Sequence, residues 1–298
     1  MSLDLTCDVA VIGAGPAGAT AAYLLARHGV DVHLFDKQLF PRPKLCAGLI
    51  TWKTIDLLER TFHLSLDGLK HHGLIQHSCR DYRIYFQGTE ISRGRLAFPF
   101  HFVDRSIYDH HWLRMAAAAG ARVTTGTAVA QVDAGSGRLT LADGRAVQSR
   151  IIIGADGVWS RSRRSLTGPK ARERLWRSNL AATIETYLAY GGKKCRPNFA
   201  SLHFGYVPWG YAWSFPGANG KTLGIAGLAP KGHGSIRGAF RDFLESIGIS
   251  EAIDGDWKGY PLPYGNYLCR PAHQRLLLIG DACGLADPLL GEGIYSAH

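Results

Sequence analysis

The chain lacks any long hydrophobic run. Although 46% of its 298 residues are hydrophobic, no apolar stretch approaches the roughly 18–20 residues that a membrane-spanning helix needs. The strand pattern begins within the first few residues, which leaves no room for a signal peptide. We therefore expect a cytoplasmic protein without a transmembrane segment.

Several motifs that carry chemistry are also missing. The six cysteines show no C-x-x-C spacing, so we interpret them as reduced thiols and not as a disulfide framework. The 13 histidines form no H-E-x-x-H pattern, and we expect no metal. The absence of a G-x-S-x-G motif argues against the nucleophile elbow of the serine hydrolases.

Acidic residues are scarce relative to basic ones. The 24 Asp and Glu stand against 34 Lys and Arg, giving a net charge of +10. The excess is densest in a basic stretch, opposed only by Glu173, that contains Arg161, Arg163, Arg164, Lys170, Arg172, Arg174 and Arg177. A solvated surface, attraction to an anionic membrane or substrate head, and nucleic-acid binding are the three interpretations. No nucleic-acid-binding module accompanies the charge, so we expect no nucleic-acid partner.

A glycine-rich motif follows the first predicted strand. Residues 7–12 form a short apolar run that is typical of a buried parallel strand. The sequence Gly-Ala-Gly-Pro-Ala-Gly follows at residues 13–18, and an apolar helix pattern then runs to Ala26. Residues 30–35 predict a second strand that ends at Asp36. This is a G-x-G-x-x-G motif in a βαβ setting, which indicates dinucleotide binding.

Each residue of this motif has a physical role. Gly13 permits the tight turn, Gly15 lets the backbone approach a pyrophosphate at the helix N-terminus, and Gly18 lets the helix and strand pack closely. Asp36 would accept hydrogen bonds from the adenosine ribose. The motif alone leaves FAD and NAD as alternatives.

Two later strands also end beside an aspartate. Residues 150–157 end in Gly-Ala-Asp-Gly and contain Asp156, and residues 276–282 end in Gly-Asp-Ala and contain Asp281. An aspartate in this position suits a hydroxyl-rich ribityl chain, and a helix start at Gly293 would offer N–H groups to anionic oxygens. Each motif alone could be an ordinary turn, but the three in this order indicate FAD. We expect Asp281 to be buried against the ribityl chain and Asp36 to lie nearer solvent, at the ribose.

The order of these motifs resembles the FAD-dependent oxidoreductases of the para-hydroxybenzoate hydroxylase fold, and best of all the geranylgeranyl reductase family. Residues 40–48 (Phe-Pro-Arg-Pro-Lys-Leu-Cys-Ala-Gly) are similar to the family's F-P-R-x-K-x-C-G-G segment. Residues 210–216 (Gly-Tyr-Ala-Trp-Ser-Phe-Pro), followed by Gly224, are similar to its Y-x-W-x-F-P…G signature. Residues 285–296 resemble its closing segment. The family runs on past the position of His298, so the resemblance implies a C-terminal truncation.

The chain departs from the family pattern in three places. Ala47 stands where glycine is usual, Cys283 where alanine is usual, and Asp36 where glutamate is common. The shorter Asp36 should still bind the ribose.

Carried over residue by residue, the resemblance implies a set of cofactor contacts. They are Gly13, Gly15, Pro16, Ala17, Gly18, Asp36, Lys37, Cys46, Ala47, Gly48, Arg105, Val129, Asp156, Asp281, Gly291, Gly293 and Ile294. For Arg105, a salt bridge with Asp109 one helical turn on is the alternative.

The resemblance also implies where the substrate binds. Tyr211, Trp213 and Phe215 alternate along one strand and share a face, so we expect them to line a substrate tunnel; sheet core is the alternative for each. Cys46 is a candidate proton donor or steric wall beside the flavin, and a buried thiol without function is the alternative.

The expected fold is α/β, with a Rossmann-like FAD-binding domain (residues 1–75, 100–168 and 268–298) and an inserted antiparallel-sheet substrate domain (residues 76–99 and 169–267). The implied activity is saturation of carbon–carbon double bonds in a polyprenyl substrate by hydride from non-covalent reduced FAD, with NADPH as electron donor and peripheral membrane contact. A flavin monooxygenase or halogenase is the rival enzyme. A flavin-bearing adaptor for membranes or RNA, using the basic stretch, is the non-enzyme alternative.

Overall fold

The computed structural model describes residues 5–167, 170–191, 198–228, 234–249 and 255–298. The chain divides into two compact units: residues 1–43, 106–180 and 263–298 form the first, and residues 44–105 and 181–262 form the second. This division differs from the predicted boundaries, most clearly at residues 44–75. That segment belongs to the second unit because its short strand pairs there, with Leu49 opposite Phe102.

The first unit is built on a largely parallel sheet with the strand order β15-β16-β9-β1-β2-β6. Its strands are β1 (Leu5–Ile12), β2 (Val32–Phe35), β6 (Arg122–Thr124), β9 (Ala146–Gly154), β15 (Ala272–His273) and β16 (Leu276–Leu278). In addition, β8 (Arg138–Leu141) pairs antiparallel with β9, and β7 (Val129–Asp133) pairs antiparallel with β8. Ala10 and Val11 on β1 are both fully buried. Burial of both faces is what the continuous apolar pattern of this central strand predicts.

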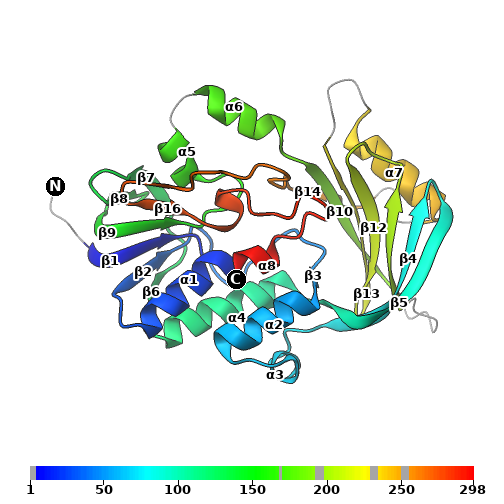
Figure 1. The fold of residues 1–298 in the computed structure, drawn as a ribbon, viewed down its shortest axis with the longest axis horizontal. Coiled ribbons are helices and arrows are strands. Elements are labelled where there is room, and N and C mark those ends of the chain that lie inside the picture. Colours follow the sequence, from blue (N-terminus) through cyan, green and yellow to red (C-terminus); the bar gives the residue numbers. More distant parts are fainter. Residues whose placement is uncertain (1–4, 168–169, 192–197, 229–233, 250–254) are drawn as a thin grey trace. The chain divides into compact units, whose positions relative to one another are not determined.

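Helices cover this sheet and shape its C-terminal edge. They are α1 (Pro16–Arg27), α4 (Arg105–Ala118), α5 (Arg161–Thr167), α6 (Lys170–Ser178), the 3₁₀ turn η2 (Gly280–Ala282) and α8 (Ile294–Ala297). Figure 1 shows α1 and α4 on the same side of the strands. The chain leaves α1 through Gly29, whose φ of +75° suits a residue without a side chain. The β1-α1-β2 unit confirms the predicted Rossmann-like arrangement.

The second unit contains an eight-stranded sheet in the order β14-β10-β13-β12-β11-β4-β5-β3. The strands are β3 (Leu49–Ile50), β4 (His77–Phe86), β5 (Thr89–Phe102), β10 (Ala182–Ala189), β11 (Phe199–Phe204), β12 (Gly210–Pro216), β13 (Gly220–Gly227) and β14 (Lys258–Gly259). The predicted antiparallel sheet is confirmed, with one exception: β11 and β4 run parallel. Two short helices, α2 (Trp52–Phe62) and α3 (Leu66–His71), follow β3.

The two faces of this second sheet bury different side chains. On one face, α7 (Ile236–Ser246) buries Phe240 and Phe243 against Ala212 of β12. On the other face, Trp213 and Phe215 of the same strand form a separate apolar cluster. The alternation along β12 follows from the period of two in an extended strand.

Candidate functional site

The glycine motif of the first unit is held by close backbone contacts. Gly13 adopts a φ of +102°, and a Cβ on it would lie 2.3 Å from the carbonyl oxygen of Ala155. A Cβ on Gly18 would lie 1.8 Å from the carbonyl oxygen of Gly13. Any side chain at these two positions would therefore push α1 away from the sheet. Pro16 and Ala17 open α1, where the missing N–H of proline costs no hydrogen bond.

Asp36 at the end of β2 is more buried than predicted. Only 9% of the residue is exposed. Its carboxylate accepts a hydrogen bond from the Ala14 N–H at 2.7 Å and another from the Gln38 N–H at 2.8 Å. Asp36 is thus held inside the turn, while the chain alone buries Asp281 only in part; burial of Asp281 against the ribityl chain of FAD stays a prediction. Lys37, the next residue, is exposed.

Arg42 lies beside the glycine motif, although the sequence-based contact set omits it. A Cβ on Gly15 would have one neighbour within 4 Å, the Nη2 atom of Arg42 at 3.8 Å. The same guanidinium pairs at 3.2 Å with Asp109 of α4, whose side chain is fully buried. The space over Gly15 is therefore bordered by a fixed positive charge and by the first amides of α1. This combination favours an anionic oxygen.

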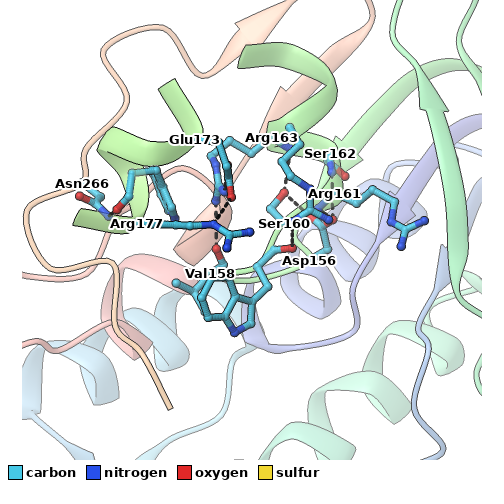
Figure 2. Close-up of polar contacts among 12 residues, drawn as sticks. Asp156, Val158, Ser160, Arg161, Ser162, Arg163, Glu173, Arg177 and Asn266 are labelled. Carbon is cyan, nitrogen blue, oxygen red and sulfur yellow. Dashed lines mark hydrogen bonds and ion pairs between the residues drawn. The ribbon is translucent and has the colours of Figure 1, made fainter. Parts of the chain in front are cut away.

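Asp156 has a local structural role. Figure 2 shows its carboxylate directed at the start of α5, where it accepts hydrogen bonds from the Arg161 N–H at 2.7 Å and the Ser162 N–H at 3.0 Å. The Ser160 hydroxyl also donates to it at 2.5 Å. Asp156 thus satisfies the first two N–H groups of α5 from outside the helix, and this uses acceptor capacity that a cofactor hydroxyl would need. Contact of Asp156 with a cofactor stays a prediction.

The second aspartate motif lies in η2. The Oδ1 atom of Asp281 is 3.2 Å from the position of a Cβ on Gly293, so the aspartate and the start of α8 lie close together. Glu292 caps that helix by accepting from the Tyr295 N–H at 2.7 Å. Cys283, one of the departures from the family pattern, is 2% exposed, and burial raises its pKa to about 11. It is therefore an unreactive thiol at neutral pH.

The remaining predicted contacts lie at element ends or in the core. Val129 opens β7 and is buried in the apolar core of the first unit, and Arg105 opens α4 and is partly exposed. Ile294 is buried at the start of α8, while Gly291 precedes it in a turn with a φ of +69°. The structure shows Asp109 paired with Arg42; a cofactor contact for Arg105 stays a prediction.

The basic stretch is not simply a solvated surface. Arg163 is 1% exposed, and its guanidinium donates to the Val158 carbonyl at 2.9 Å and to Glu173 at 2.8 Å (Figure 2). The same group lies 3.8 Å from the centre of the Trp176 ring. The Asn266 amide donates to the Trp176 carbonyl at 2.9 Å. The surface interpretation is therefore wrong for Arg163, which ties α5 to α6 within the first unit.

The second unit brings the Cys46 segment and the aromatic residues together. Ala47 and Leu49 pack against the cluster that contains Trp213 and Phe215, with Tyr211 at its margin. Trp213 and Phe215 are 7% and 6% exposed. Gly48 donates its N–H to the Cys46 Sγ at 3.4 Å. We name this side of the sheet the Trp213 face, defined by Tyr211, Trp213 and Phe215.

Sequence reasoning missed one charged residue on this face. Glu185 of β10 lies on this face, because it is paired with Gly224 of β13, which is paired in turn with Trp213 of β12. Burial raises the pKa of Glu185 to about 7, although the Cys46 N–H and the Lys44 ammonium both favour its charged form. The sequence around Glu185 predicts an ordinary strand and contains no motif that would indicate a functional role for this residue.

Within the described residues, no group of three or more His, Cys, Asp or Glu could hold a metal ion. None of the helices placed by the structure is long and apolar enough to cross a bilayer.

Comparison with known proteins defines the class. Residues 6–185 match the model of the FAD binding domain family. The menaquinone reductase of Mycobacterium tuberculosis is 32% identical over 316 residues, covering 99% of this chain and 74% of the relative. The digeranylgeranylglycerophospholipid reductase of Methanosarcina acetivorans is 30% identical, covering 97% and 72%.

Solved structures share the fold. A geranylgeranyl bacteriochlorophyll reductase-like protein from Thermoplasma acidophilum superimposes with a TM-score of 0.78 at 22% identity, covering 98% of this chain and 75% of that chain. PqsL of Pseudomonas aeruginosa, described as a probable FAD-dependent monooxygenase, gives a TM-score of 0.74 at 20% identity, covering 98% and 83%. The fold is thus shared with a protein described as reductase-like and with one described as a probable monooxygenase.

Together these matches identify an FAD-binding oxidoreductase. More narrowly, the chain belongs to the geranylgeranyl reductase family of FAD-dependent oxidoreductases.

Proposed function

We propose that the chain saturates carbon–carbon double bonds in a polyprenyl substrate with electrons from reduced FAD. The observation that carries this proposal is the Trp213 face, where aromatic side chains belong to the cluster against which Ala47 and Leu49, just after Cys46, pack. An isolated alkene has no charge or strong dipole to recognise, so it binds through shape and apolar contact. Menaquinone and digeranylgeranylglycerophospholipid, the compounds in the relatives' names, both carry polyprenyl chains.

The first unit fits FAD at its phosphates. The space over Gly15 lies beside the Arg42 guanidinium, and the first turn of α1 supplies free N–H groups for a pyrophosphate. Asp36 would face the adenosine ribose while its two backbone hydrogen bonds hold it in place. When bound and reduced, FAD would supply hydride to one alkene carbon, and a proton at the other carbon would complete the saturation.

The protein's own residues would position the substrate and exclude water. Trp213 and Phe215 would hold the alkene in an apolar environment, which keeps water away from the transferred hydride. Cys46 would lie beside the reacting carbon as a proton donor or steric wall. NADPH as electron donor and contact with a membrane surface through the basic stretch belong to the same proposal.

The test is turnover with substrates that share a polyprenyl chain and differ in head group. The chain is loaded with FAD, reduced anaerobically with dithionite, and offered menaquinone, geranylgeranyl diphosphate or a digeranylgeranyl lipid. Mass spectrometry should show the addition of two hydrogens per double bond for at least one of them. Oxygen-dependent products with no hydrogen addition would instead support the monooxygenase or halogenase alternative.

A further inference from the structure

A pocket lies on the face of the second sheet that is opposite the Trp213 face. Ser214, which stands between Trp213 and Phe215 along β12, lines this pocket. Ser214 pairs with Ser201 of β11 on one side and with Leu223 of β13 on the other, and Leu223 belongs to the cluster under α7. Alternate residues of a strand point to opposite faces, so the sheet itself separates the pocket from the Trp213 face.

The pocket has the size of a site for one small molecule. Its volume is about 290 Å³, near the lower end of the range of about 300–1,000 Å³ that is usual for small-molecule sites. Ile247 and Ile249, which follow α7, line one side, and Gly88 in the turn between β4 and β5 lines another. This space suits a single ring with a short substituent and is too small for a dinucleotide.

Aromatic rings line much of this space. Tyr85, Tyr190 and Phe199 all border it. The Tyr85 ring stacks on the imidazole of His203, with centroids 4.6 Å apart and planes 5° apart. The guanidinium of Arg83 lies 4.1 Å from the centre of the Phe199 ring. Rings that are fixed by such stacking offer flat surfaces to an aromatic ligand.

The sheet beneath the pocket carries a short chain of hydrogen bonds. The Ser201 hydroxyl donates to the Ser214 carbonyl at 3.3 Å, so it accepts the bond of 3.0 Å from His203 Nε2. Burial lowers the pKa of His203 to about 4, and the neutral imidazole keeps an acceptor at Nδ1. This nitrogen has no hydrogen-bond partner among the residues that the structure describes. Unpartnered buried nitrogens are uncommon, so this face has hydrogen-bonding capacity that the described chain does not use.

Lys221 supplies the charge of the pocket. Of the described residues that line it, only Lys221 is charged at neutral pH. Lys221 lies two residues before Leu223 on β13 and therefore shares its face. The last carbonyls of α7, at Phe243 and Glu245, accept hydrogen bonds from N–H groups that follow the helix. The ammonium is thus the main electrostatic feature of the lining, and it favours an anionic group on the ligand.

We propose that this pocket binds a small aromatic carboxylate, with its ring among Tyr85, Tyr190 and Phe199 and its carboxylate on Lys221. The site goes beyond the proposed function, because the polyprenyl chain and the flavin are assigned to other parts of the chain. Its occupancy can be measured without any turnover.

Benzoate is the probe for a direct test on the FAD-loaded chain. With isotope-labelled isoleucine methyl groups, a titration followed by nuclear magnetic resonance should show saturable binding, with a dissociation constant of about 1 mM or tighter. Nuclear Overhauser contacts should join the benzoate ring protons to the methyl groups of Ile247 and Ile249. Binding that does not saturate, or ring contacts only to other methyl groups, would overturn the proposal.

Two further probes separate the ring from the charge. Benzamide has the same shape without the charge, and acetate has the carboxylate without the ring. Each should bind at least about tenfold more weakly than benzoate, because each lacks one of the two contacts. Benzamide or acetate binding as tightly as benzoate would contradict the assignment.

A pair of lysine variants tests the position of the charge. Lys221→Met keeps the length of the side chain and should weaken benzoate by about tenfold while leaving benzamide unchanged. Lys258→Met is the matched control: Lys258 is exposed on β14 and pairs in register with Glu185, which lies on the Trp213 face. It should leave benzoate binding unchanged, and equal weakening in both variants would show a general charge effect and no site. If Lys221→Met does not fold, the methyl contacts and the three probes decide the question in the wild-type chain.

Discussion

The glycine motif of the first unit and the Trp213 face of the second are built in different ways. The motif is fixed by backbone: Gly13 and Gly18 leave no room for a Cβ, and the Ala14 N–H is bound by Asp36. The Trp213 face is fixed by side chains: the indole fills the space over Gly224. Almost any substitution at the first site should therefore disrupt it, while substitutions at the second site should have effects of graded size.

The largest effect is expected from a substitution in the glycine motif. In Gly18→Ala the new Cβ would meet the Gly13 carbonyl at 1.8 Å, and neither atom can rotate away. We expect a loss of about 4 kcal/mol or more in unfolding free energy, together with loss of bound FAD. Urea unfolding and flavin absorbance measure both.

Gly29→Ala is the control for this change. It places a Cβ on a glycine with a φ of +75° but with nothing within 4 Å, so only about 1–2 kcal/mol of backbone strain is expected. Equal losses in the two variants would show that the close approach at Gly18 is not what fixes the motif.

The next largest effect is expected from a substitution on the Trp213 face. Trp213→Ala removes a buried ring from the Trp213 face and should cost about 3 kcal/mol of stability, with lower polyprenyl turnover. Trp209→Ala is matched in chemistry, but Trp209 is 75% exposed, and we expect under about 1 kcal/mol. Thermal unfolding, flavin content and turnover are measured together. A fully active Trp213→Ala protein would argue against a substrate role for this face.

A third prediction concerns pH. Burial raises the Glu185 pKa from 4.5 to about 7, so the folded chain binds a proton more tightly than the unfolded chain. The stability that this proton contributes is complete below pH 4.5 and is lost as pH rises through about 7. Glu185→Gln should match wild type at the acid end and become more stable by about 3 kcal/mol at the alkaline end. Urea unfolding across this range checks it; a constant difference would contradict the raised pKa.

The smallest effects on stability are expected from substitutions of two aspartates, Asp36 and Asp281. Asp36→Ala leaves the Ala14 and Gln38 N–H groups without their acceptor, which should cost about 2 kcal/mol. Asp281 is partly exposed, so Asp281→Ala should cost about 1 kcal/mol or less in the protein without FAD. Denaturant unfolding of both FAD-free variants decides the order. The reverse order would show that the buried position of Asp36 does not stabilise the turn.

The two sites also differ in how far sequence could predict them. The glycine motif, Asp36 and the strands that flank them are close in sequence, and their spacing follows from one turn and one helix. The alternation of Tyr211, Trp213 and Phe215 likewise predicts a shared face. These are local consequences of backbone geometry, which short patterns record well.

The residues that were missed depend on distant partners. Arg42 is held by an ion pair with Asp109 in α4, and Glu185 lies on the Trp213 face because β10 pairs with β13, far away in the chain. The burial of Arg163 requires Glu173 and Trp176 on the next helix. A charge inside a basic stretch or an ordinary strand carries no local sign of such partners, so only the folded chain shows them.

The strand order of the first sheet has a consequence for the newly made chain. The early strand β1 lies beside β9, and β9 lies beside β16, with Leu276 opposite Ile152. Ala17 in the glycine motif packs against Gly280, where an added Cβ would lie 2.9 Å from its own. On the ribosome, the motif is made before β9, β16 and Gly280 and can close only after they have been made, while β4 and β5 can pair as neighbours much earlier. Capture of the cofactor must then wait for parts of the chain made long after the motif itself.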